Sequence, residues 1–168
     1  MRGPDGGMAM AQTVGDIMQK QVRTIRPDQT LPELERALLR WRIGAMPVVE
    51  PDGQLAGIVS RSDVVRQLCL ERSLGEAMAD AYRDQTDAGF ADHSQSAIAG
   101  NIGQRMERLC VRDVMIRDVL SVPPDLPVAK AAQLLVERRI HRLPVVEDGK
   151  LVGIVSSLDF TRVVAEGR

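Results

Sequence analysis

The seven residues GIVSRSD at positions 57–63 return almost unchanged as GIVSSLD at positions 153–159. The preceding residues repeat as well, since MPVVE at 46–50 corresponds to LPVVE at 143–147. A Val-x-Asp-x-Met pattern opens each half of the chain, at Val14 and at Val111. Self-similarity of this kind is typical of a supersecondary unit that cannot bury its apolar face alone. The sequence therefore predicts two copies of one unit.

Each copy predicts the same order of elements, namely strand, helix, strand, strand, helix. Short β-rich runs at 22–25 and 119–122 are closed by prolines, and apolar residues then recur at helical spacing from Leu31 and from Val128. Thr30 and Glu33 have the spacing of a capping box at the start of the first of these helices. The turn sequences PDG and DG separate β-rich runs, which predicts a hairpin in each copy. A last helix is expected from about residue 62 and from about residue 158.

These elements predict an α/β fold. A sheet with one apolar face needs a second layer, so we expect two β-α-β-β-α repeats packed sheet to sheet with helices outside, plus inserted helices. The expected boundaries are a flexible N-terminal tail at 1–13, a first repeat at 14–69, a helical insert or linker at 70–110 and a second repeat at 111–168.

Composition argues against several classes of function. The chain has 22 Lys and Arg against 23 Asp and Glu, which argues against a nucleic-acid partner or a basic membrane-binding face. No apolar run is long enough to span a membrane, and the start MRGPDGGMAM lacks the apolar run of a signal peptide. Cys69 and Cys110 fit no zinc or CxxC spacing. Two free thiols favour a reducing compartment, so we expect a cytoplasmic protein.

The order of elements, the PVV before each hairpin and the GIVSxxD after it resemble the CBS domain, named for cystathionine β-synthase. Two such domains in tandem resemble a Bateman module, and the resemblance covers about residues 14–70 and 111–166. It implies a regulatory module that is not an enzyme, requires no cofactor, binds AMP, ADP, ATP, S-adenosylmethionine or NAD, and pairs into a flat homodimer. The sequence also predicts no catalytic activity, because no nucleophile–base pair, metal cluster or Gly-rich phosphate loop is visible.

The stretch between the repeats departs from the family pattern, in which the repeats follow each other closely. Apolar residues recur there at rough helical spacing, which predicts that the last helix of the first repeat runs on, or restarts, to about Gln85 and that a second helix follows. The apolar residues of this stretch that need cover include Met78, Ile98, Ile102 and Met106.

The repeated S-x-x-D motif has two interpretations. Ser60 with Asp63, and Ser156 with Asp159, have the spacing of a helix-capping box. The same geometry suits a ligand, because a helix N-terminus offers free N–H groups to phosphate and a carboxylate accepts from both hydroxyls of a ribose. The resemblance implies that the Ser and the Asp contact phosphate and ribose. Both interpretations remain open at this point.

The two copies differ just before the PVV run, which predicts two unequal clefts. The second copy has His141 and Arg142, and in the resemblance a basic residue at the Arg142 position implies a phosphorylated adenosine. The alternative is a solvated charge at a strand end. The first copy has small residues there and offers Arg61 and Ser62 beside Ser60 as donors instead.

Further candidates follow from the resemblance, which places the adenine ring between strand residues. They are Thr24, Ile25, Met46, Pro47, Ser121, Val122, Leu143 and Pro144. Each has core packing as its alternative role. Gly57 and Gly153 lack a side chain, so they are expected to let a ligand approach the strand closely.

The predicted function is therefore a regulatory sensor module for an adenosine nucleotide of the AMP, ADP or ATP type. It is expected to form a homodimer and to act on an unidentified protein partner. The alternatives are a structural dimerisation or partner-binding module with vestigial clefts, and a module that binds S-adenosylmethionine or NAD.

Overall fold

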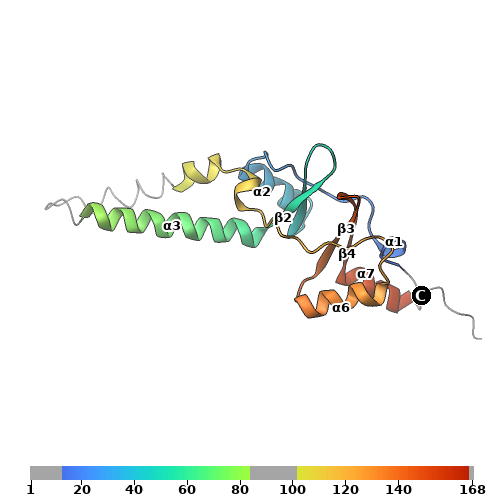
Figure 1. The fold of residues 1–168 in the computed structure, drawn as a ribbon. Helices are drawn as coiled ribbons and strands as arrows, with labels where there is room; N and C mark the ends of the chain where they lie inside the picture. The colour runs from blue at the N-terminus through green and yellow to red at the C-terminus, as the bar shows by residue number, and fades with distance from the viewer. Residues whose placement is uncertain (1–12, 84–101, 167–168) are drawn as a thin grey trace, which may run out of the picture. The chain divides into compact units, whose positions relative to one another are not determined.

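The computed structural model describes residues 13–83 and 102–166. The predicted tail up to residue 12 and the central part of the predicted insert, with Gln85 and Ile98, lie outside the described residues. The chain divides into two compact units. The Asp63 unit comprises Arg23–Val119, and the Asp159 unit comprises the residues up to Val22 together with those from Leu120 onward. The predicted α/β class is confirmed, because the elements are helices and two small antiparallel sheets (Figure 1).

The Asp63 unit contains the first hairpin and the long helix that follows it. Its elements are α2 (Leu31–Arg40), β1 (Ala45–Val49), β2 (Leu55–Ser60), α3 (Arg61–Arg83), a helical segment at 102–108 and α5 (Val111–Val114). The Asp159 unit contains the second hairpin. Its elements are α1 (Val14–Ile17), α6 (Val128–Arg138), β3 (Arg142–Glu147), β4 (Lys150–Ser156) and α7 (Ser157–Glu166).

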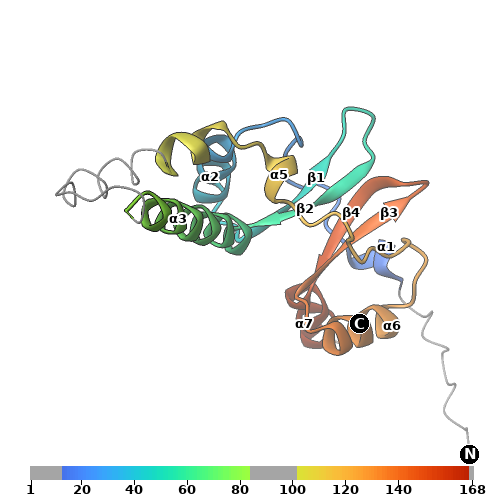
Figure 2. The same cartoon turned by 60° about the vertical axis from the view of Figure 1, so that its left-hand side comes forward.

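Both predicted hairpins are confirmed (Figure 2). β1 pairs with β2 and β3 with β4, both antiparallel, and each ladder shifts register once, between Val48 and Val49 and between Val145 and Val146. The turns have the positive φ angles that PDG and DG predict, since Gly53 has φ of 90° and Gly149 of 79°. The last helices begin at residues 61 and 157, one residue before the predicted starts.

The predicted strands at 22–25 and 119–122 are not formed as strands. Each contributes a single parallel bridge, from Ile25 to Val48 and from Val122 to Val145. Ile25 donates its N–H to the carbonyl of Pro47 at 3.1 Å and accepts from the N–H of Val49 at 2.9 Å. A proline follows closely in each run and has no N–H to donate, which ends the pairing after one residue.

The opening segment of each sequence repeat packs on the hairpin of the other repeat. In the Asp159 unit, Gln19 exchanges two backbone hydrogen bonds with Ile154 of β4, at 2.9 and 3.0 Å. In the Asp63 unit, Ile116 does the same with Ile58 of β2, at 2.9 Å in both directions. These segments therefore cover the second edge of each hairpin. As a result, each compact unit combines the opening segment of one sequence repeat with the hairpin of the other.

This packing explains the two glycines before the S-x-x-D motifs. A Cβ at Gly57 would lie 2.6 Å from the carbonyl oxygen of Ile116 and 3.0 Å from the sulfur of Met115. A Cβ at Gly153 would overlap the sulfur of Met18. The expectation that a ligand uses this space is wrong, because the chain itself fills it.

The stretch after the first hairpin is helical where it is described. α3 is unbroken over its 23 residues, which at a rise of ~1.5 Å per residue makes it about 35 Å long. Residues 102–108 form a helix that lies alongside α3 in Figures 1 and 2. Glu71 of α3, whose side chain is 8% exposed, pairs with Arg105 at 2.9 Å and accepts from the amide of Gln67 at 3.1 Å. An ion pair between a buried carboxylate and a half-exposed guanidinium therefore joins the two helices.

Candidate functional site

Both units have the same construction at the start of the last helix. Ser60 ends β2 and Asp63 lies in the first turn of α3, while Ser156 and Asp159 hold these places before and in α7. One oxygen of Asp63 accepts from the Ser60 N–H at 2.8 Å and hydroxyl at 2.5 Å. The corresponding distances at Asp159 are 2.7 and 2.6 Å. The capping interpretation is therefore confirmed in both copies, and it uses one oxygen of each carboxylate.

The second carboxylate oxygen distinguishes the two copies. Asp63 Oδ1 accepts a hydrogen bond from Nη1 of Arg66 at 3.1 Å. Asp159 Oδ1 lies 3.8 Å from Nη1 of Arg162, which is too long for a hydrogen bond. Both aspartates are buried, at 4% and 3% exposure. Within the described residues, Asp159 Oδ1 is the one buried side-chain polar atom without a hydrogen-bond partner.

Sequence reasoning missed Arg66 and Arg162. Each arginine is the third residue after the aspartate, so both copies extend the motif to S-x-x-D-x-x-R. The signal was available in the repeat itself. At this spacing on a helix, side chains face each other, which allows an arginine to reach the free oxygen of the aspartate.

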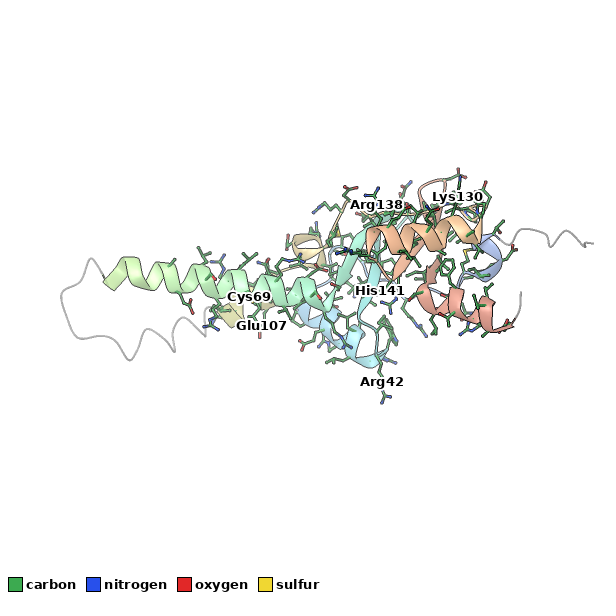
Figure 3. The ribbon with its side chains drawn as sticks, turned by 90° about the horizontal axis from the view of Figure 1, so that it is seen from below. Arg42, Cys69, Glu107, Lys130, Arg138 and His141 are labelled. Atoms are coloured by element: carbon green, nitrogen blue, oxygen red, sulfur yellow. The ribbon has the colours of Figure 1, made fainter. Side chains whose placement is uncertain are left out.

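The basic residues predicted for the second copy lie beside the α7 cap. Arg142 is directly opposite Ser156 in the β3–β4 register. The N–H of Ser157 donates to the carbonyl of His141 at 3.0 Å, which holds the residue before β3 against the start of α7. Both basic side chains are exposed, and Figure 3 marks His141 near the end of α6. The structure thus brings Arg142, Ser156 and Asp159 to one end of one hairpin.

The corresponding place in the Asp63 unit lacks a basic side chain on the strand. Ala45 lies opposite the last residue of β2, and the Arg61 N–H donates to the carbonyl of Gly44 at 3.0 Å. The Arg61 guanidinium reaches the carbonyl of Leu38, near the end of α2, at 3.5 Å. Ser62 is exposed. The predicted donors of the first copy are therefore present, but the arginine among them is directed at α2.

Most candidates for contact with an adenine ring have buried side chains. Those whose side chains pack in the two cores are Ile25, Met46, Pro47, Val122, Leu143 and Pro144. Thr24 is exposed and Ser121 is half-buried. Each precedes the residue that forms the parallel bridge, so each lies at the edge of its hairpin. Of this set, Thr24 and Ser121 offer side-chain polar groups at the surface.

In residues 13–83 and 102–166, no three His, Cys, Asp or Glu side chains are grouped so that they could hold a metal ion. No helix there combines the length and the apolar character that a membrane span needs. Cys69 and Cys110 are both free thiols, the first exposed and the second half-buried.

The CBS domain family matches this chain twice, at residues 14–69 and 111–166. An uncharacterised protein of Methanocaldococcus jannaschii is 33% identical over 153 residues, which is 87% of each chain. The CBS domain-containing protein YhcV of Bacillus subtilis is 28% identical and is matched over 79% of its length. An inosine-5'-monophosphate dehydrogenase of M. jannaschii is 26% identical over 88% of this chain, but the match covers 22% of that enzyme.

Solved structures share the fold. The structure of CBSX2 in complex with AMP has a TM-score of 0.66 at 23% identity, over 92% of this chain and 97% of that one. The CBS domain pair of MJ0100, solved with 5'-methylthioadenosine and S-adenosylmethionine, has a TM-score of 0.62 at 23% identity. It covers 94% of this chain and 99% of that one.

Proposed function

The chain belongs to the CBS domain family and carries two such domains in tandem, and on this premise we propose that it is a regulatory module that binds an adenosine nucleotide. The observation that carries the proposal is Asp159, a buried carboxylate with one oxygen that has no hydrogen-bond partner and has only a long ion pair, to Arg162 at 3.8 Å. A buried acceptor without a partner is costly and calls for an explanation. A ribose hydroxyl is a donor that would complete it.

The groups around Asp159 suit the rest of such a ligand. The hydroxyl and N–H of Ser156 are used in the cap and the N–H of Ser157 binds the carbonyl of His141. The remaining N–H groups in the first turn of α7 can donate to phosphate oxygens. Arg142 lies across the ladder from Ser156 and has an exposed, planar guanidinium that can grip phosphate with two donors. Ser121, at the hairpin edge, can donate to a ring nitrogen or to the ribose.

Solved structures of the same fold support an adenosine ligand, and the charge of Arg142 favours some adenosine ligands over others. Structures of the same fold have been solved with AMP and with 5'-methylthioadenosine and S-adenosylmethionine. S-adenosylmethionine carries a sulfonium cation, which a free arginine beside the site would repel. We therefore propose AMP, ADP and ATP as the preferred ligands. S-adenosylmethionine and NAD, of which NAD also carries phosphate, are the less favoured alternatives.

We also propose how the module is used. The domains are taken as residues 14–69 and 111–168, with 70–110 as a helical insert between them. Relatives that are enzymes contain a match to this chain as a small part of a larger protein. This supports a regulatory role without catalysis, in which nucleotide occupancy is read by a protein partner in the cytoplasm.

A second candidate function is structural pairing into a homodimer. Large apolar side chains are exposed on α3, α6 and α7, namely Val65, Leu68, Val136, Leu158 and Val164. Exposed apolar groups on neighbouring turns are typical of an interaction surface. Pairing and nucleotide binding are compatible, so this candidate becomes an alternative only if no nucleotide binds.

A calorimetric titration of the purified chain with AMP, ADP, ATP, NAD and S-adenosylmethionine tests the proposal. We expect saturable binding of at least one of the first three ligands. The absence of binding by all five at millimolar concentration would contradict it and would leave the structural role.

A further inference from the structure

We infer that the nucleotide binds only in the Asp159 unit, and that the corresponding position in the Asp63 unit is closed by the chain's own Arg66. This inference rests on the proposed function and assigns it to one of two homologous positions. It is carried by three differences between the copies, which concern the free carboxylate oxygen, the strand residue opposite the capping serine and the arginine after that serine.

The first difference is the occupancy of the carboxylate. Asp63 already has both oxygens satisfied, one by Ser60 and the other by Arg66 at 3.1 Å. A ribose hydroxyl that binds there must displace a charge-assisted hydrogen bond and replace it with a weaker neutral donor. At Asp159 the same oxygen has no hydrogen-bond partner, so a hydroxyl gains a bond and displaces none. Binding to Asp159 is therefore favoured.

The second difference is the residue opposite the capping serine. Arg142 faces Ser156 across β3 and β4, whereas Ala45 faces Ser60 across β1 and β2. No described residue accepts a hydrogen bond or forms an ion pair with the Arg142 guanidinium, so it can bind a phosphate without giving up a bond. The strand of the Asp63 unit presents a methyl group at the same position.

The third difference is the use of the arginine after the serine. Arg61 directs its guanidinium to the carbonyl of Leu38, near the C-terminus of α2, where the helix dipole favours a cation. The Asp159 unit has the shorter, exposed side chain of Ser157 at this place. In the Asp63 unit, Arg61 thus contacts the end of α2 and Arg66 pairs with Asp63 within α3, so both arginines near the motif are already used inside the chain.

The inference specifies the ligand chemistry as well as the location. A site with one open carboxylate oxygen and one free guanidinium recognises a molecule that carries a hydroxyl donor and an anion. A nucleoside phosphate has both groups, and adenosine has only the first. We therefore expect one nucleoside phosphate to bind per chain, with the phosphate contributing through Arg142.

The test uses AMP as the probe and the full chain, with stoichiometry and affinity measured by calorimetry. The wild type is expected to bind one AMP per chain. Asp159→Asn should weaken binding by at least about tenfold, which corresponds to ~1.4 kcal/mol, because an amide offers a weaker acceptor than a carboxylate. Asp63→Asn is the matched control and should leave the affinity within about twofold.

A gain-of-function variant keeps the inference testable even if an aspartate variant unfolds. Ala45→Arg combined with Arg66→Leu gives the Asp63 unit the free carboxylate oxygen and the strand arginine of the other unit. We expect this double variant to bind two AMP molecules per chain. If it still binds one, the assigned differences do not decide binding and the inference fails.

The outcomes separate this inference from the proposed function. Two AMP molecules per wild-type chain, with each aspartate variant removing one, would overturn the inference and retain the proposed function. Loss of binding in Asp63→Asn alone would do the same. No binding of AMP, ADP or ATP by the wild type would overturn both.

Discussion

At the scale of single residues, the same motif does different work in its two copies. Ser60–Asp63 and Ser156–Asp159 make nearly identical caps, with all four distances between 2.5 and 2.8 Å. The difference arises from the second oxygen, which accepts a hydrogen bond from Arg66 at 3.1 Å in one copy and lies 3.8 Å from Arg162 in the other. A motif read from sequence shows that a carboxylate is present, but its availability to a ligand depends on distances that only the folded chain determines.

Arg142→Ala tests the assignment of phosphate to that residue. We expect the loss of affinity to grow with the number of phosphates, with about 1.5–3 kcal/mol lost for ADP and almost no change for adenosine. His141→Ala, one residue away and also exposed, is the control and should have a smaller effect. Calorimetry with adenosine, AMP and ADP measures the series. Equal losses for adenosine and ADP would show that Arg142 acts by supporting the fold.

Gly57 and Gly153 allow a prediction about close packing. Gly57→Ala places a methyl group 2.6 Å from the backbone oxygen of Ile116, which cannot move without disturbing the ladder, so we expect destabilisation of about 1–3 kcal/mol. Gly153→Ala meets mainly the flexible side chain of Met18 and should cost less. Urea unfolding measures both variants.

The double variant Met18→Ala with Gly153→Ala provides the matched control. Removing the methionine side chain should recover part of the stability lost at Gly153. The same exchange of Met115 should not rescue Gly57→Ala, because a backbone atom remains in the way. Equal rescue at both positions would contradict the packing account.

At the scale of elements, features that depend on nearby residues were predicted better than the pairing of segments far apart in the sequence. The hairpins, the helix starts and the Thr30–Glu33 capping box follow from residues close together in the sequence, and the box is formed, with Glu33 accepting from the Thr30 N–H at 2.7 Å. The runs at 22–25 and 119–122 have strand composition but form single bridges. How far each run pairs depends on its partner strand and on the proline that follows it. No local signal specified that each opening segment packs on the other hairpin.

The capping box of α2 predicts a dependence of stability on pH. Hydrogen bonds from the backbone and side chain of Thr30 lower the pKa of Glu33 below its ordinary value. A carboxyl whose pKa is lower in the folded state contributes stability above its unfolded pKa and loses it as the pH falls through the folded pKa. We therefore expect Glu33→Gln to unfold with a weaker dependence on acid pH than the wild type. Parallel slopes in acid titrations followed by circular dichroism would contradict this.

The pair between α3 and the helical segment at 102–108 makes a further prediction. Arg105→Ala leaves the buried Glu71 carboxylate with the amide of Gln67 as its remaining described partner, so we expect a loss of about 1–3 kcal/mol. Arg72→Ala breaks an exposed pair with Glu76 and is the control, with an expected change below about 1 kcal/mol. Urea unfolding compares the two. Similar small effects would show that the pair between Arg105 and Glu71 does not hold the segment.

At the scale of the whole molecule, the repeat made the family and the fold class predictable. The candidate site was predictable in part, because Ser156, Asp159 and Arg142 are readable from the motif and from the difference between the copies. The repeat contains Arg66, but its pairing with Asp63 could not be predicted without a distance. For Met46 and Leu143 the choice between ligand contact and core packing stayed open until the packed core was known. The features that the sequence did not predict therefore depend on tertiary contacts.

The exposed apolar helices predict that the chain forms a dimer. Leu158 and Val164 of α7 are 64% and 80% exposed, so Asp at both positions should leave each unit folded. If these side chains are covered by a second copy, unpaired carboxylates there are costly and the dimer should dissociate. Light scattering with an unchanged circular dichroism spectrum measures this. A monomeric wild type, or a double variant that remains dimeric, would contradict the prediction.

The most direct test of the account is a crystal structure of the chain grown with saturating AMP. The account predicts one AMP per chain, with a ribose hydroxyl within hydrogen-bonding distance of Asp159 Oδ1, the phosphate beside Arg142, and Asp63 still paired with Arg66. AMP bound at Asp63 with Asp159 unoccupied, or a chain without AMP under these conditions, would contradict it.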